Sequence, residues 1–224
     1  MLTHAARAVP WPRVVVASLV VVVLLELVRW NPWTLWPLEG TAVGLLAGAA
    51  AWCFDEQAAV VVDVTPRGLA WRTSARLTGV LVLTVTWCAV VVHARDALFD
   101  EAPAVLTQGL VAIVLGTSWA TWRRSRGEAM PGLAAATVTV PLATAWALAR
   151  PFEHELPVFP YGYAGLESDW RLSTTGWCIA AVVAALALAG ALTDARWWRA
   201  GISRRPGPSR GAPRGVDGAQ RLPA

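Results

Sequence analysis

The amino-acid sequence predicts an all-α membrane protein, a polytopic bundle of six transmembrane helices with both termini in the cytoplasm. Composition is the first reason, because 56% of the 224 residues are hydrophobic and only 15% are charged, whereas about a quarter of the residues of an average soluble domain carry charge. The second reason is a set of six apolar runs that approach the ~20 residues a helix needs to cross a bilayer. The third is the uneven distribution of arginine between the loops.

The six predicted spans occupy residues 14–30, 35–54, 77–94, 104–122, 129–149 and 176–195. The first and third are the most apolar at their centres, and the first is long enough to be a span rather than a cleavable signal peptide. The second is rich in small residues, which favour close helix contact over lipid exposure, and it carries Glu39 near one end. Pro141 in the fifth removes a backbone hydrogen bond and predicts a kink.

Arginine supplies all 19 positively charged side chains, and its distribution predicts the orientation. The N-terminus, the second and fourth loops and the C-terminal tail hold 15 arginines, and the other three loops hold 4. The positive-inside rule therefore places both termini in the cytoplasm of a multi-pass plasma-membrane protein. Residues 1–13 are a short N-terminus and 14–199 the six-helix domain. The Pro-, Gly- and Arg-rich tail, 200–224, is predicted to be disordered and to meet anionic lipid headgroups.

Enzyme chemistry is not expected of this chain. It contains no lysine, which excludes a Walker A phosphate loop and a Schiff base. Cys53, Cys88 and Cys178 have neither disulfide-framework nor zinc spacing. The run FEHE at 152–155 offers carboxylates and an imidazole, but adjacent residues do not converge on one ion, so a solvated loop is the better interpretation. We therefore predict no catalytic residue, no metal site and no cofactor.

Few ionisable residues fall inside the predicted spans. Glu26 lies three residues before Arg29, so an ion pair at the end of the first helix is expected, with a proton-relay or transport role as the alternative. Neutral polar residues within spans are candidates for lining a pathway, although hydroxyls at depth more often bond their own backbone or a neighbouring helix. These candidates are Gln108, Thr137, Thr139 and Thr144.

The predicted loop between the fifth and sixth spans, residues 150–176, is long and aromatic. Its 27 residues include three prolines, two tyrosines, two phenylalanines and a tryptophan. Long loops with apolar content of their own are often functional. We expect either a cap that dips back into the outer end of the bundle or a packed external loop. The candidate cap residues are Phe159, Tyr161, Tyr163 and Trp170.

The segment after the second span, residues 55–76, divides at Thr65 and Pro66 into two short predicted helices. Asp55 is placed to cap the first, which carries two carboxylates seven residues apart and therefore on one face. Thr65 and Pro66 suit the N-cap and first position of the second helix, which is expected to run directly into the third span. The residues that we expect to contact a partner are Glu56, Asp63, Arg67 and Arg72.

Six spans, cytoplasmic termini, no ATP site, a helical element after span two and an elaborated outer loop before span six together resemble the permease subunit of an exporter-type ABC transporter. The resemblance is one of pattern over most of the chain and includes no diagnostic motif. It implies that the segment after span two docks on a separate ATP-hydrolysing subunit through the four residues just named. It also implies a homodimer or heterodimer of permeases and an outer cap at 157–165. Nucleic acid is not an expected partner.

A second hypothesis belongs to a different class. A non-catalytic membrane scaffold or regulatory protein would use the same cytoplasmic segment and the basic tail to hold a partner. A membrane enzyme of lipid or cell-wall metabolism is disfavoured, because the spans lack a buried set of acid, base and nucleophile. Neutral polar spans and an aromatic cap are compatible with a lipophilic cargo, a peptide or a polymer, so the sequence does not choose a substrate.

Overall fold

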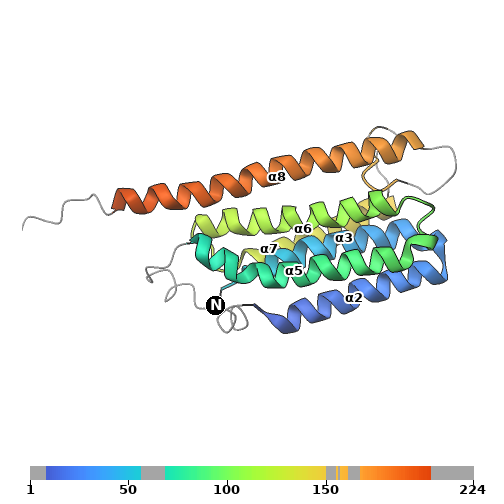
Figure 1. The fold of residues 1–224 in the computed structure, drawn as a ribbon, viewed down its shortest axis with the longest axis horizontal. Coiled ribbons are helices and arrows are strands. Elements are labelled where there is room, and N and C mark those ends of the chain that lie inside the picture. The colour runs from blue at the N-terminus through green and yellow to red at the C-terminus, as the bar shows by residue number, and fades with distance from the viewer. Residues whose placement is uncertain (1–8, 57–68, 150–154, 156, 161–166, 203–224) are drawn as a thin grey trace, which may run out of the picture.

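The fold is a bundle of long helices lying side by side (Figure 1). The computed structural model describes residues 9–56, 69–149, 155, 157–160 and 167–202, and no strand occurs in these ranges. The helices are α2 (Trp11–Trp30), α3 (Leu35–Trp52), α5 (Leu69–Ala94), α6 (Ala102–Ser125), α7 (Pro131–Ala149) and α8 (Glu167–Ile202), with short 3-10 turns η1 (Pro32–Thr34) and η2 (Arg95–Ala97). Each predicted span coincides with one of the long helices, which confirms the all-α prediction.

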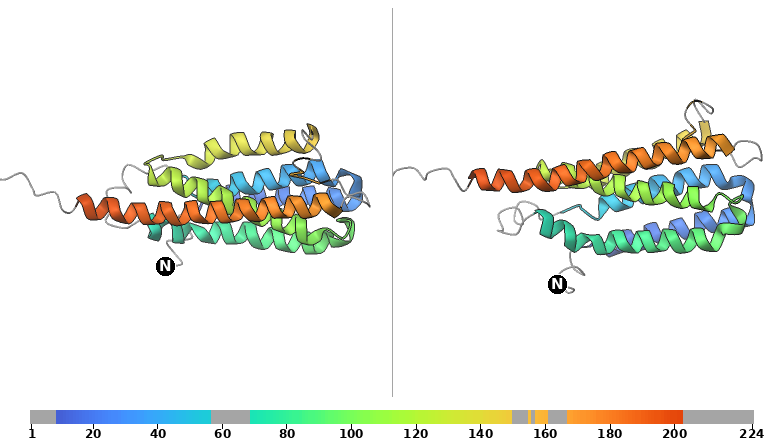
Figure 2. Two further views of the ribbon diagram at one scale, coloured as in Figure 1. Left: turned by 90° about the horizontal axis from the view of Figure 1, so that it is seen from above. Right: turned by 45° about the horizontal axis from the view of Figure 1, so that its top comes forward.

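Five of the described helices are long and apolar enough to cross a membrane, namely α2, α5, α6, α7 and α8. The chain is therefore a multi-pass membrane protein by its helices. The prediction of six spans is confirmed only in part, because α3 is not among the five. This helix lies in the middle of the bundle, in contact with α2, α6 and α7 (Figure 2). Protein therefore surrounds much of this helix.

Small residues bring α3 and α7 into close contact, as the sequence predicts. Gly40, Gly44 and Gly48 recur every four residues and face α7. A Cβ atom added at Gly44 would lie 2.8 Å from the Cβ of Ala143 and 2.9 Å from the carbonyl oxygen of Thr139. Helix backbones can approach this closely only where side chains are absent or small. The backbones of α3 and α7 are therefore closely packed along the three glycines.

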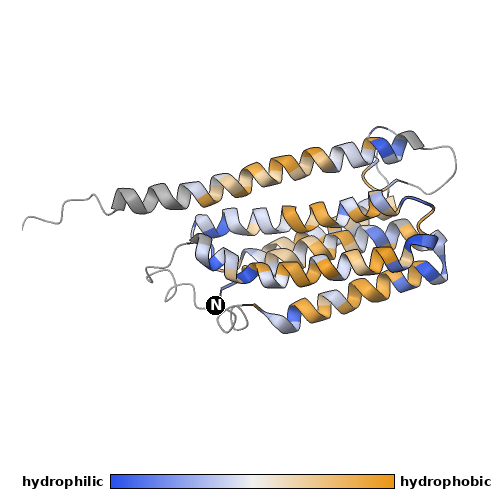
Figure 3. Cartoon of the chain, in the orientation of Figure 1, coloured by the Kyte–Doolittle hydropathy of each residue, from blue (hydrophilic) through white to orange (hydrophobic). Residues whose placement is uncertain are grey.

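Hydrophilic residues gather toward the two ends of the bundle, and apolar residues predominate in the middle (Figure 3). Among the side chains that the structure describes, one end, called the basic end below, holds Arg13, Arg72, Arg76, Arg123, Arg124 and Arg126 with Asp55, Glu56 and Glu128. The opposite end holds Arg29, Arg95 and Arg171 with Glu26, Asp96, Asp100, Glu101, Glu155 and Asp169. The predicted asymmetry is thus present in three dimensions. That the basic end faces the cytoplasm stays a prediction.

The last helix corrects two predicted boundaries. α8 begins at Glu167 and continues to Ile202, whereas hydropathy predicted a span at 176–195, a loop up to 176 and a tail from 200. Its 36 residues correspond to about 54 Å of helix, well beyond the ~30 Å of a bilayer core. Figure 1 shows α8 projecting past the other helices. Helical structure does not stop where apolar composition stops, which explains the error. The rest of the predicted tail, 203–224, lies outside the described residues.

Candidate functional site

A buried ion-pair cluster joins three helices at the basic end. Glu56, four residues after α3, places one carboxylate oxygen 3.1 Å from Nη2 of Arg76 and the other 3.2 Å from Nη2 of Arg124. The three side chains are only 13%, 8% and 4% exposed. We call Glu56, Arg76 and Arg124 the clasp, because one carboxylate connects the end of α3 to α5 and α6.

Three further polar groups of the clasp bond to backbone carbonyl oxygens. Nη1 of Arg76 donates to the carbonyl oxygen of Phe54 at 2.6 Å, and Nη1 of Arg124 donates to that of Glu128 at 2.9 Å. The amide of Glu56 donates to the carbonyl oxygen of Ala129 at 2.9 Å. Buried charges are tolerated when both pairing and hydrogen bonding are satisfied. These bonds therefore fix the basic ends of three helices relative to one another.

Asp55 extends the same connection to α7 and α2. Its Oδ1 accepts a hydrogen bond from the amide of Gly132 at 2.6 Å, in the first turn of α7, and its Oδ2 lies 3.5 Å from Nη1 of Arg13. The Arg13 guanidinium lies 5.9 Å from the centre of the Trp52 ring. Burial raises the pKa of Asp55, against the opposing effects of the Gly132 amide and Arg13. The helix that Asp55 is predicted to cap lies outside the described residues, so that prediction stays open; within the described ranges this carboxylate caps α7.

The predicted partner contacts are distributed unevenly. Glu56 is turned into the bundle, and its carboxylate already binds two arginines. Arg72 is half-buried next to it and lines a small hollow with Phe54 and Thr73. Asp63 and Arg67 lie outside the described residues. Of the two that are described, Glu56 therefore has a role within the chain that sequence reasoning missed. Its arginines are 20 and 68 residues away, so local spacing gave no signal.

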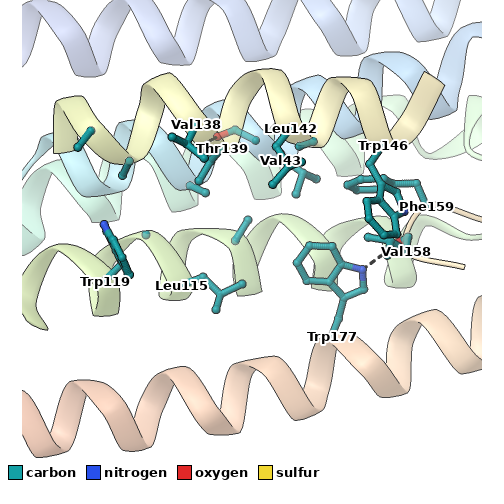
Figure 4. A pocket seen from close by; sticks show the side chains of 17 residues that line it. Val43, Leu115, Trp119, Val138, Thr139, Leu142, Trp146, Val158, Phe159 and Trp177 are labelled. Carbon is teal, nitrogen blue, oxygen red and sulfur yellow. Dashed lines mark hydrogen bonds between the residues drawn. The ribbon is translucent and has the colours of Figure 1, made fainter. Parts of the chain in front are cut away.

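An apolar pocket of about 760 Å³ lies between α3, α6, α7 and the first part of α8 (Figure 4). It extends from Trp119 on α6 to Trp146, Phe159 and Trp177 at the opposite end. Its walls are the following side chains and glycines: Val43, Gly44, Ala47, Ala112, Leu115, Gly116, Trp119, Ala134, Ala135, Val138, Thr139, Leu142, Ala143, Trp146, Val158, Phe159 and Trp177. Its volume is typical of small-molecule sites, which measure about 300–1,000 Å³.

The segment 157–160 closes the pocket at the end away from the clasp. The carbonyl oxygen of Val158 accepts hydrogen bonds from Nε1 of Trp177 and Oγ of Ser173, both at 3.0 Å. The rings of Phe159 and Trp177 lie 6.0 Å apart between centroids. Of the predicted cap residues, Phe159 thus lines the pocket and Trp170 is buried. Tyr161 and Tyr163 lie outside the described residues, and re-entry into the bilayer stays a prediction.

The four candidate pathway residues do not gather in one place. Thr139 lines the pocket. Thr144 lies 3.0 Å from the Thr41 hydroxyl and donates to its own helix, and Thr137 also bonds its own helix. Gln108 is buried, and within the described part of the chain neither of its amide atoms has a hydrogen-bond partner. The two outlying threonines follow the alternative interpretation, in which hydroxyls in spans satisfy backbone carbonyls.

Two further carboxylates have contrasting environments. Glu39 on α3 is 0% exposed, and neither of its oxygens has a hydrogen-bond partner among the described residues. Burial of a carboxyl group without a hydrogen-bond partner costs free energy. Glu26 is partly exposed and forms the predicted pair with Arg29 at 2.7 Å, with Nε2 of His93 also 3.0 Å away. The predicted Glu26–Arg29 ion pair is confirmed. The burial of Glu39 without a partner was not predicted, because it results from the packing of neighbouring helices around α3.

Comparison with known proteins gives no further guide to these sites. The chain matches no family model, no curated protein and no solved structure. Within the described ranges, no group of three or more His, Cys, Asp or Glu side chains is arranged to hold a metal ion. The clasp and the pocket are therefore the two features from which a function can be argued.

Proposed function

We propose that this chain is the membrane-spanning permease subunit of an ABC-type exporter, which moves its substrate across the plasma membrane with a separate ATP-hydrolysing subunit. A multi-pass helical bundle with sorted charge supports this proposal. The observation that carries it is the clasp. It joins the start of the predicted docking segment, 55–76, to helices that line the pocket.

The clasp could transmit a movement of the docking segment to the helices that line the pocket. Residue 57 follows Glu56 directly, and Glu56 binds Arg76 of α5 and Arg124 of α6, while Asp55 holds the first turn of α7. α3, α6 and α7 are also the main walls of the pocket. A movement imposed on 57–68 by a partner would therefore reach every main wall through buried polar contacts. Packed interfaces of this kind switch between discrete arrangements rather than deforming continuously.

This geometry divides the four predicted contact residues by role. Asp63 and Arg67 belong to the segment that would meet the ATP-hydrolysing subunit. Glu56, held by Arg76 and Arg124, would transmit the movement into the bundle, with the half-buried Arg72 beside it. The pocket would hold the transported molecule, or part of it, between the moving walls.

A scaffold or regulatory protein is the second candidate, and α8 is the observation that favours it. This helix continues beyond the apolar stretch Asp169–Thr193 to Ile202, and a projecting helix can hold a partner without any transport. The scaffold gives the pocket no task, which is why we prefer the permease.

The experiment is purification of the tagged chain from its native membrane, followed by ATP-hydrolysis assays in lipid nanodiscs. We expect an ATP-hydrolysing subunit to copurify with the wild type and to be lost with Asp63→Arg and Arg67→Glu. Arg95→Glu is the matched control, because Arg95 is an exposed arginine at the opposite end. If the wild-type complex does not hydrolyse ATP, or if both variants retain the ATP-hydrolysing subunit, the permease hypothesis is rejected and the scaffold hypothesis is favoured.

A further inference from the structure

The pocket walls contain no charged side chain. Thr139 contributes a hydroxyl that lies 3.5 Å from the carbonyl oxygen of Gly44, and the Trp177 indole is bonded to Val158. The remaining surface is almost entirely aliphatic and aromatic. A ligand that carried hydrogen-bonding groups into this pocket would leave them unsatisfied, at a large cost in free energy. The part of a ligand that enters must therefore be hydrocarbon.

The pocket has the length of one lipid chain. Its wall on α7 runs from Ala134 to Trp146, which is about 18 Å of helix. Half of a hydrocarbon core of about 30 Å is about 15 Å. A single acyl chain from one leaflet would therefore fill the pocket from end to end.

The pocket is reached from the side of the bundle. Val138 and Leu142 line it, yet each is 59% exposed, and Trp119 on α6 is also exposed. In the close view, α7 and α8 lie on opposite sides of the pocket, and Trp177 projects from α8 toward Phe159 (Figure 4). In a membrane, this opening would face the lipid hydrocarbon rather than water.

The two ends of the pocket differ in charge. The far end is closed by Val158, Phe159 and Trp177. At the basic end, the Arg123 guanidinium lies 5.5 Å from the centre of the Trp119 ring, which is part of the pocket wall. Arg123 is partly exposed and also pairs with Glu128. A partly exposed guanidinium at the mouth of a hydrocarbon site suits a phosphate group, which arginine binds through several donors.

We infer that the pocket binds an anionic phospholipid from the leaflet at the basic end, with one acyl chain between α7 and α8 and its phosphate at Arg123. The hydrocarbon lining, the leaflet-long wall, the lateral opening and the single charged mouth all select this occupant. Describing the lipid as a substrate rests on the permease function proposed above, whereas its binding does not.

The test uses the full-length chain in nanodiscs that contain phosphatidylglycerol with a photoreactive diazirine halfway along one acyl chain. Crosslinks are mapped by mass spectrometry, and we expect them on 134–146 of α7 and 112–119 of α6, with saturation by unlabelled phosphatidylglycerol. Leu115→Trp fills the pocket and is expected to abolish these crosslinks. Leu186→Trp is the matched control, because Leu186 is 68% exposed on α8 and does not line the pocket.

The headgroup is tested by comparing phosphatidylglycerol with phosphatidylcholine carrying the same diazirine chain. Wild type is expected to prefer phosphatidylglycerol, and Arg123→Gln to lose about five-fold of that preference, the factor that one arginine contributes at an anionic surface. Unchanged phosphatidylcholine labelling would show that the Arg123→Gln pocket is intact.

Unsaturable labelling of the pocket, equal to that on the exposed face of α8, would overturn the inference, and so would full labelling of Leu115→Trp. Equal labelling by the two lipids would remove the anionic headgroup from it. Saturable labelling without ATP-driven transport would keep the lipid site and reject the permease. ATP-driven transport by a chain whose pocket is never labelled would support the permease and reject the lipid site.

Discussion

The clasp and the pocket share α3 and α6, yet they differ in what lies between the helices. In the clasp, the Glu56 carboxylate pairs with the buried Arg76 and Arg124, and both arginines make additional backbone hydrogen bonds. In the pocket, about 760 Å³ of space is bordered almost entirely by apolar side chains. Directional contacts therefore fix the helices at the basic end, while the space along α7 and α8 is left for another molecule. The bundle is anchored at one end and adaptable along one side.

Glu39 and Glu56 repeat this contrast within a short stretch of sequence. Glu39 is fully buried and the Glu56 side chain is 13% exposed, but Glu56 has two guanidinium partners, whereas Glu39 has no hydrogen-bond partner within the described part of the chain. Pairing with two guanidinium groups compensates the desolvation of the Glu56 carboxylate, whereas no described group compensates that of the Glu39 carboxyl. The same residue type therefore has different energetic roles, decided by what the neighbouring helices supply.

The largest expected effect is that of Glu56→Gln. Removing the carboxylate leaves two buried guanidinium groups without their counter-charge, which is expected to lower the free energy of unfolding by about 3–5 kcal/mol. The measurement is denaturant titration of the purified protein in detergent micelles, followed by tryptophan fluorescence.

Glu39→Gln is the matched control for this change. It exchanges a partnerless buried carboxyl for an amide of almost the same volume, so the free energy of unfolding should change by less than about 1.5 kcal/mol. Equal losses from Glu39→Gln and Glu56→Gln would contradict the distinction between a paired and an isolated carboxylate.

A smaller effect is expected in the contact between α3 and α7. Gly44→Ala places a Cβ atom 2.9 Å from the backbone oxygen of Thr139, and overpacking of this kind lowers the free energy of unfolding by about 1–3 kcal/mol. Gly176→Ala provides the comparison, because a Cβ atom there meets nothing within 4 Å. That change should leave stability unchanged or raise it through helix propensity. Destabilisation by both changes in the same titration would show that the α3–α7 contact is not special.

The smallest effect concerns the pH dependence contributed by Asp55. Its pKa is raised in the folded chain from the ordinary value of 3.8, so the folded state binds a proton more tightly than the unfolded state does. This contribution therefore increases the free energy of unfolding as the pH falls through the raised pKa toward 3.8. Asp55→Asn keeps an oxygen acceptor for the Gly132 amide and should remove this contribution.

The measurement is the unfolding free energy at a series of pH values from 7 down to about 4, the ordinary range of the carboxyl group. Asp96→Asn serves as the control, since that side chain is 92% exposed and its substitution should leave the profile unchanged. A wild-type profile that Asp55→Asn does not alter would argue against the burial of this carboxylate.

The sequence by itself determined the helices, their approximate ends and the separation of charge. These properties depend on residues that are close along the chain, since an apolar run of sufficient length forms a span whatever its neighbours are. Arginine counts in short loops likewise needed no tertiary information. The Glu26–Arg29 pair was predictable for the same reason, because it is formed within one helix. Local composition did not predict the ends of α8, where charged residues continue the helix beyond the apolar stretch.

Tertiary structure decided which residues pair with Glu56 and Asp55 and where the apolar pocket lies. Glu56 meets Arg124 across 68 positions and Asp55 caps α7 across 77, separations at which neither spacing nor periodicity carries information. The pocket exists because α7 and α8 lie apart on either side of α3 and α6, with Phe159 and Trp177 closing one end. Hydropathy along the chain shows how apolar a segment is. Whether another side chain or an empty pocket lies next to that segment depends on how the helices pack.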